Sequence, residues 1–154
     1  MNIRTASVEL RSKAPLLMHR YTGEKPPEPK PTVAKKTQEW IDGKHKKDWI
    51  QSAYFDRGMF HIPPEVIESA MVSGARKFRK GKSFQGAVMV EEDFIPLMVY
   101  DEEFKNGRAL KGNLEDFYLP EYIDLRGVRI QQARIDRCRP IFRFWGLSFT
   151  IRFD

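Results

Sequence analysis

The last ten residues of the chain, WGLSFTIRFD at 145–154, alternate apolar with polar or small side chains without exception. In an extended chain, side chains two residues apart lie on the same side, so this period of two predicts a β-strand with one buried face. The apolar face consists of Trp145, Leu147, Phe149, Ile151 and Phe153. Residues 3–11 alternate in the same way and predict a second strand.

Residues 64–80 predict the main helix. Pro63 and Pro64 precede Glu65, which suits a first helical turn, because proline needs no N–H partner there and an acid favours the positive end of the helix dipole. Apolar and small residues then recur at spacings of three and four, basic residues fill the last turns, and Gly81 favours a stop. One helix against mostly antiparallel strands indicates an α+β fold.

The remaining elements are less regular. A hairpin is expected at 53–62, turning at Asp56–Gly58, and a strand at 84–90. Residues 94–100 form a further apolar run, in which Pro96 indicates an edge strand or a bulge, and an extended run at 126–137 ends before Pro140. Residues 101–124 are acidic and predict an irregular segment.

A proline-rich and lysine-rich region separates the first strand from the rest. Residues 22–31, TGEKPPEPKP, contain four prolines and predict a loop. Residues 32–50 predict only a weak, short helix, because Gly43 interrupts the apolar spacing. We therefore expect one domain over residues 1–154, in which 22–50 is a flexible insertion or finger.

Charge is distributed unevenly along the 154 residues, although the formal net charge is only +6. Residues 1–22 carry four basic residues against one acidic (+3), and 70–82 carry five basic residues and no acid (+5). Residues 91–124 hold ten acids against three bases (−7), whereas 125–144 hold six arginines against one acid (+5). Such polarity can steer a polyanion to one surface or join copies head to tail.

Several classes of protein are excluded or disfavoured. No apolar stretch reaches the roughly 18 residues of a membrane-spanning helix, and the first residues do not read as a leader peptide. The one cysteine, Cys138, precludes an internal disulfide and favours a cytoplasmic setting. No phosphate-binding glycine loop is present, and we expect no cofactor and no metal, because the three histidines lack ligand spacing.

Candidate catalytic residues are few. The three histidines are weak candidates for metal-free RNA cleavage, in which imidazole acts as a general acid or base: His19, His45 and His61. Cys138 lies between two arginines, which would favour a thiolate, but neighbours in a strand point to opposite faces. A structural cysteine is therefore the favoured interpretation.

Nucleic-acid binding needs only cations for the phosphates and flat groups for the bases. Arginine serves both purposes, since it binds phosphate through two hydrogen bonds and stacks on bases. The predicted binding residues are Arg126, Arg129, Arg134, Arg137, Arg139 and Arg143, with Arg76, Lys77, Arg79, Lys80 and Lys82 at the helix end and Lys44, Lys46 and Lys47 in the insertion.

Two groups of motifs resemble known proteins. The first strand ends in APLLMH at 14–19, a lysine-rich insertion follows, and Gly58, Phe60 and the IPP at 62–64 lead into the helix. With the arginine-rich strands, this order resembles the RAMP superfamily of CRISPR-associated proteins, above all its Cas7-type members, and implies a ferredoxin-like, RRM-like core. The same start and the RPIFRFW ending at 139–145 are similar to small phage-encoded proteins. One departure from the RAMP pattern is the absence of a glycine-rich C-terminal loop, since Gly146 stands alone.

The resemblance implies a non-catalytic protein that coats single-stranded RNA or DNA, with RNA preferred, by self-association of copies along the strand as a homo-oligomer. Other CRISPR-type or phage proteins are expected as further partners, and no membrane. Two alternatives stay open: a metal-free endoribonuclease, and a phage inhibitor or adaptor that binds a protein through the acidic segment.

Overall fold

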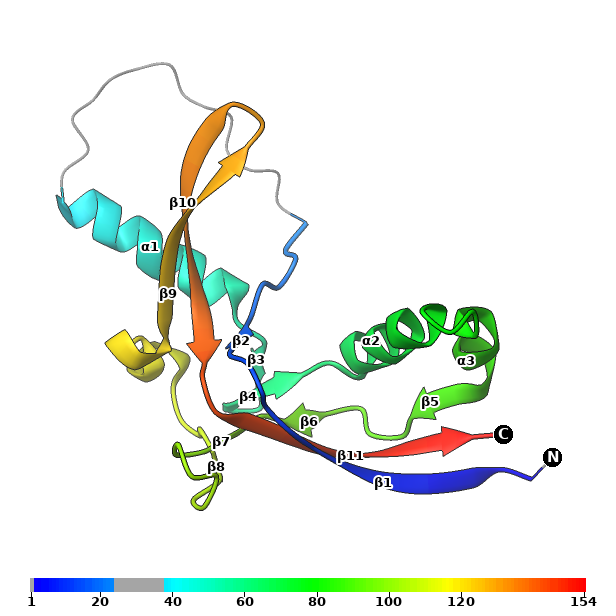
Figure 1. The fold of residues 1–154 in the computed structure, drawn as a ribbon. Helices are drawn as coiled ribbons and strands as arrows, with labels where there is room; N and C mark the ends of the chain where they lie inside the picture. The colour runs from blue at the N-terminus through cyan, green and yellow to red at the C-terminus, as the bar shows by residue number, and fades with distance from the viewer. Residues whose placement is uncertain (1, 24–37) are drawn as a thin grey trace. The chain divides into compact units, whose positions relative to one another are not determined.

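The computed structural model describes residues 2–23 and 38–154 (Figure 1). These residues form two compact units, each of which is described by itself below. The described residues of unit 1 are 2–15, 55–112 and 143–154, and those of unit 2 are 16–23, 38–54 and 113–142. Helices combine with strand pairs that are antiparallel in every described case, which confirms the α+β class.

The C-terminal strand organises unit 1. β11 (Trp145–Phe153) pairs along its length with β1 (Arg4–Arg11), and the two run side by side in Figure 1. The other side of β11 pairs with β5 (Val88–Val90) and β7 (Met98–Val99), and β8 (Arg108–Ala109) follows β7. Both strands predicted from alternation are thereby confirmed.

A small second sheet in unit 1 contains the predicted hairpin. β3 (Phe55–Asp56) and β4 (Met59–Ile62) are joined through Arg57 and Gly58, whose φ angles of 52° and 74° suit a tight hairpin turn. β6 (Ile95–Pro96) pairs with β4 at the edge of this sheet, where a proline is tolerated. The predictions of a hairpin here and of an edge position for Pro96 are confirmed.

The predicted main helix is shorter than expected, and the strand predicted at 84–90 is largely wrong. α2 (Pro64–Arg76) ends four residues before residue 80, in a turn where Arg79 has a φ of 60°. The chain then forms α3 (Gly81–Ala87), and only Val88–Val90 are extended. Packing of α3 on α2 overrides the weak alternation at 84–90, and Gly81 provides space for the side chain of Arg76.

The core of unit 1 lies between its strands and α2. Each sheet and α2 contribute apolar side chains that are almost fully buried. They are Phe60, Ile62, Ile67, Ala75, Val90, Ile95, Leu97, Leu110, Leu147 and Phe149.

Unit 2 is built on a long hairpin, which corrects the single extended run predicted at 126–137. β9 (Ile123–Ile130) and β10 (Ala133–Phe142) pair antiparallel and turn at Gln131, whose φ is 54°. β2 (Leu16–Leu17) pairs with the end of β10. Pro140 does not end β10. Its carbonyl accepts a hydrogen bond from the Met18 N–H, so its backbone nitrogen faces the same side of the strand. β2 ends at Leu17 on that side, so β2 requires no N–H from Pro140.

A regular helix covers this hairpin. α1 (Gln38–Ser52) packs against β10, crosses the hairpin obliquely in Figure 1, and is longer than the weak helix expected within residues 32–50. Trp49 is fully buried, and its Nε1 donates a hydrogen bond to the Tyr122 carbonyl at 2.8 Å. Tertiary packing therefore stabilises a helix that includes Gly43. Residues 24–37 of the expected finger lie outside the described residues.

The acidic segment is divided between the units. Residues up to 112 belong to unit 1, and the two short 3-10 helices η1 (Leu114–Phe117) and η2 (Pro120–Tyr122) belong to unit 2. The irregular structure expected at 101–124 is confirmed apart from β8, these two turns and residues 123–124, which begin β9. Within the described ranges, no helix combines the length and apolarity needed to cross a membrane.

Candidate nucleic-acid interface

The register of the β9–β10 hairpin places arginines opposite one another. Arg129 is the cross-strand partner of Arg134, and Arg126 is the partner of Arg137. Like charges directly opposite on antiparallel strands destabilise the pairing. We call residues 123–142 the arginine hairpin; it carries five arginines against Asp124 and Asp136, a net charge of +3. The folded hairpin therefore concentrates positive charge that its own residues only partly neutralise.

Arginines occupy both faces of the hairpin. Because side chains alternate along a strand, Arg137 and Arg139 share one face with Arg126, whereas Arg129 and Arg134 share the other. The two faces differ in how exposed their arginines are and in whether an acid pairs with them.

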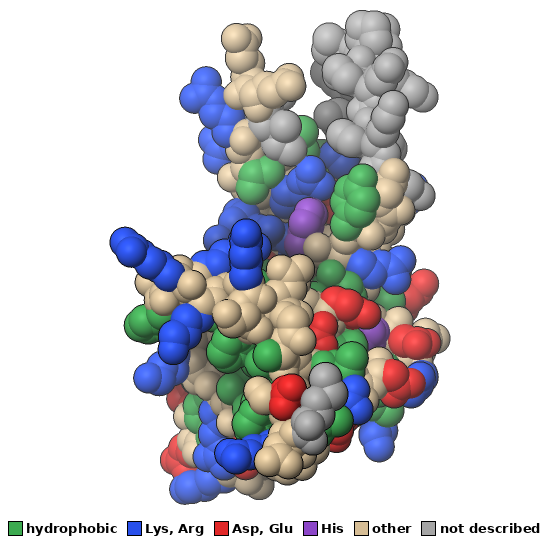
Figure 2. All heavy atoms as spheres, turned by 90° about the vertical axis from the view of Figure 1, so that its right-hand side faces the viewer, with side chains coloured by type: hydrophobic (Ala, Val, Ile, Leu, Met, Phe, Trp, Pro, Cys, Tyr) green, Lys and Arg blue, Asp and Glu red, His purple; other side chains and the backbone are tan. Residues whose placement is uncertain are grey.

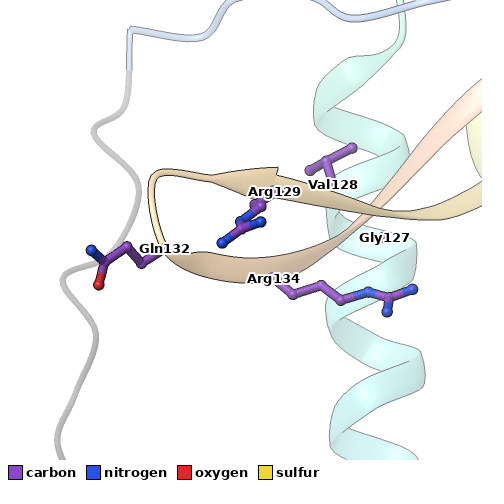
Figure 3. Close-up of a pocket in the computed structure, with 5 residues that line it drawn as sticks. All are labelled: Gly127, Val128, Arg129, Gln132 and Arg134. Atoms are coloured by element: carbon purple, nitrogen blue, oxygen red, sulfur yellow. The ribbon is translucent and has the colours of Figure 1, made fainter.

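The face with Arg129 and Arg134 lies near the turn of the hairpin (Figure 3). Both arginines are exposed, and together with Gly127, Val128 and Gln132 they line a shallow hollow of about 490 Å³. The guanidinium of Arg134 lies over Gly127, since a Cβ at that position would be 2.6 Å from the Arg134 Nε. Glycine thus allows the Arg134 side chain to lie along the hairpin, where it extends away from Arg129 in Figure 3.

On the opposite face, Asp124 holds two arginines. Its Oδ1 accepts a hydrogen bond from Arg126 at 2.6 Å, and its Oδ2 lies 3.8 Å from a terminal nitrogen of Arg139. The Asp124 and Arg139 side chains are only 12% and 19% exposed. The buried Nε of Arg139 has no hydrogen-bond partner within the described part of the chain. This face therefore holds a largely buried guanidinium whose hydrogen-bonding capacity is only partly used.

His19 belongs to the same face. It follows β2, and partial burial together with the positive charges of Arg137 and Arg139 lowers its pKa from the ordinary value. At neutral pH its imidazole is consequently uncharged and can accept a proton. His45 is half-buried on α1, whereas His61 lies on β4 in unit 1 and stacks on Phe94 with ring centroids 4.8 Å apart. Of the three candidates, only His19 lies among the arginines of the hairpin.

Cys138 is a buried structural residue, as the sequence indicated. It points away from Arg137 and Arg139, its neighbours in the strand, and is 1% exposed. Burial raises the pKa of its thiol to about 11, so that it stays protonated at neutral pH.

The lysines of α1 form a weaker part of the predicted site. Lys47 is exposed, whereas Lys44 and Lys46 are half-buried. The Nζ of Lys46 pairs with Glu115 at 3.0 Å, so an acid of the acidic segment already neutralises this charge. Lys47 is therefore the α1 lysine best placed to contact a ligand.

A second group of cations lies in unit 1. We call residues 76–82, between α2 and α3, the basic turn; its exposed cations are Arg76, Lys77, Arg79, Lys80 and Lys82. In Figure 2, which faces the α2 and α3 side of Figure 1, blue side chains project from this surface. Arg143, also exposed, begins the last segment of unit 1 and lies outside the arginine hairpin.

The chain matches no protein family, no curated protein and no solved structure with which it was compared. Among the described residues, no cluster of three or more His, Cys, Asp or Glu side chains could hold a metal ion. Interpretation of the site therefore rests on its own geometry. Sequence reasoning found the arginines, but it missed their cross-strand pairing, the position of His19 and the role of Asp124.

Proposed function

We propose that this protein binds single-stranded nucleic acid, without cleaving it, through the arginine hairpin. The observation that carries the proposal is the pairing of Arg129 with Arg134 and of Arg126 with Arg137 across the two strands. A hairpin that places like charges opposite one another loses stability on its own and regains it when an anion lies between them. A phosphate backbone supplies such anions at regular intervals.

The residue type supports a nucleic acid over other polyanions. All five cations of the hairpin are arginines, whose planar groups bind phosphate through paired hydrogen bonds and also stack on unpaired bases. Unpaired bases are available only in single strands, and the resemblance to Cas7-type RAMP proteins favours RNA among these.

Self-association along the strand forms part of the proposal, as the same resemblance implies. β1 pairs with β11 on one side only among the described strands, which leaves the opposite edge of its eight residues open. An open strand edge can pair with another extended segment. A second copy of the chain is the partner that assembly on a nucleic acid requires.

Binding of a single-stranded oligonucleotide is expected to weaken steeply with salt. Asp124 already pairs with Arg126 and Arg139, so about three arginines contact phosphates. About three phosphate contacts give a slope of roughly −2 in a plot of log affinity against log salt, or about a 20-fold loss between about 50 and about 200 mM. Fluorescence anisotropy with RNA, DNA and duplex of equal length measures this, and light scattering on the same samples counts copies per strand. Absence of binding at low salt would contradict the proposal and favour the adaptor alternative.

A metal-free endoribonuclease is the second candidate, because His19 lies beside Arg137 and Arg139. A neutral imidazole could take the proton of a ribose 2′-hydroxyl while the guanidinium groups stabilise the charge that develops on the phosphate. Cleavage of RNA, but not DNA, should then persist in EDTA and disappear in His19→Ala. Because the pKa of His19 is lowered from 6.5, activity should be lost only as the pH falls through a value below 6.5. Intact RNA after long incubation excludes this candidate.

A further inference from the structure

The end of α2 exposes a phenyl ring in the middle of the basic turn. The side chain of Phe78 is 76% exposed. The backbone there is fixed by two hydrogen bonds: the Lys80 N–H donates to the Ala75 carbonyl at 3.0 Å, and the Arg79 N–H donates to the Arg76 carbonyl at 2.9 Å. These are the two bonds of a Schellman motif, which ends a helix in a defined geometry. The ring is therefore held outward by an ordered turn.

The residues around Phe78 are unusual for such a turn. The left-handed position of a Schellman motif usually holds glycine, but here it holds Arg79, with a φ of 60°. No acidic residue occurs between Glu68 and Glu91, so the five cations of the basic turn have no acid of their own segment. The exposed Phe78 ring therefore places a flat apolar surface among five exposed cations. It suits a ligand that offers both negative charge and an apolar flat surface.

We propose that Phe78 is a stacking platform for an unpaired base, and that the cations of the basic turn hold the phosphates on either side of it. This inference rests on the proposed function and adds to it a second contact site, in unit 1. Aromatic side chains within a basic groove bind single strands in this way, because every base has a flat π surface. The bases of a duplex are stacked on each other, so the site should discriminate against double strands. A membrane surface fits less well, since Phe78 is the one large apolar side chain that the basic turn exposes.

The test separates base stacking from phosphate binding. Wild type, Phe78→Ala and Phe78→Trp are titrated with oligo(dT) and with an abasic strand of equal length, which carries the same phosphates without bases. Phe78→Ala should bind oligo(dT) about 10-fold more weakly but bind the abasic strand like wild type. Phe78→Trp should retain the affinity, and its fluorescence should be quenched by oligo(dT) more than that of wild type. Val66→Ala, which shortens another exposed apolar side chain of α2, is the matched control and should change neither affinity.

Three outcomes overturn the inference. If Phe78→Ala binds both strands as wild type does, Phe78 is not a stacking platform, and the arginine hairpin alone remains as the proposed interface. Equal weakening on both strands would show that the substitution perturbs the turn and that no base is stacked. If Phe78→Ala instead loses binding to vesicles of phosphatidylserine and phosphatidylcholine while binding oligo(dT) as wild type does, the ring contacts a membrane. If wild type binds no strand at low salt, the proposed function itself fails.

Discussion

Replacing Arg129 with glutamate should weaken binding to a single strand about 100-fold and at the same time stabilise the hairpin. The introduced carboxylate would face Arg134 directly, so an attractive pair replaces a repulsive one and adds about 0.2–1 kcal/mol to the free energy of unfolding. That new pair also occupies Arg134, so one substitution removes two arginines from the interface. Two lost charge-assisted hydrogen bonds, at about 1.5 kcal/mol each, correspond to about a 100-fold loss of affinity.

Fluorescence anisotropy over a series of salt concentrations measures the effect, and urea unfolding measures stability. The slope of log affinity against log salt should become about 1.4 less steep, because roughly 0.7 is lost for each phosphate contact. Arg108→Glu is the matched control, since Arg108 is an exposed strand arginine of unit 1 outside both cation groups. An Arg129→Glu protein that binds like wild type would show that the hairpin is not the interface. Because the substitution favours the fold, a loss of binding could not be attributed to unfolding.

Strict alternation predicted the central strand pair correctly. β1 and β11 pair through eight successive residues, and the side chains of Leu147 and Phe149 on β11 are buried in the core of unit 1. A period of two that persists over eight or more residues has no competing helical interpretation, so local sequence was sufficient there. The same rule failed at 84–90, where the alternation is short and the packing of α3 on α2 determines the structure.

The hairpin turn could not be predicted from its residue types. Two-residue hairpin turns usually contain Gly, Asn or Asp, because a positive φ is required, whereas this turn contains Gln131 with a φ of 54°. Without a turn signal, residues 126–137 read as one strand, and the arginines appeared to follow one another along it. Pairing of the two strands over eight residue pairs compensates for a poor turn residue.

The candidate site was therefore predicted in composition but not in geometry. The six arginines of 125–144 were visible in the sequence, and five of them lie on one hairpin. His19 is more than a hundred residues away along the chain, and it reaches Arg137 and Arg139 only because β2 pairs with β10. Phe78 is exposed because α2 ends at Arg76, so the helical spacing of 64–80 does not carry its side chain into the core. Both differences arise from tertiary structure that no local pattern records.

Trp49→Ala should lower the free energy of unfolding by about 3–5 kcal/mol, a large part of the roughly 5–15 kcal/mol of a typical domain. The indole is 0% exposed, donates to the Tyr122 carbonyl at 2.8 Å and packs edge-on against Tyr118 at 5.4 Å. Truncation leaves a cavity between α1 and the hairpin and removes the donor of that hydrogen bond. Urea unfolding followed by far-ultraviolet circular dichroism measures the change.

Two further variants make this prediction informative about the insertion. Trp49→Phe keeps most of the buried area but leaves the Tyr122 carbonyl without its donor, so it should cost about 1–3 kcal/mol. Lys47→Ala, at an exposed position of the same helix, should change stability by less than about 0.5 kcal/mol. If α1 were part of a flexible finger, Trp49→Ala would behave like Lys47→Ala, because an undocked side chain contributes no packing energy. A graded loss, largest for Trp49→Ala, smaller for Trp49→Phe and smallest for Lys47→Ala, would instead mean that α1 is docked on the arginine hairpin and stabilises it.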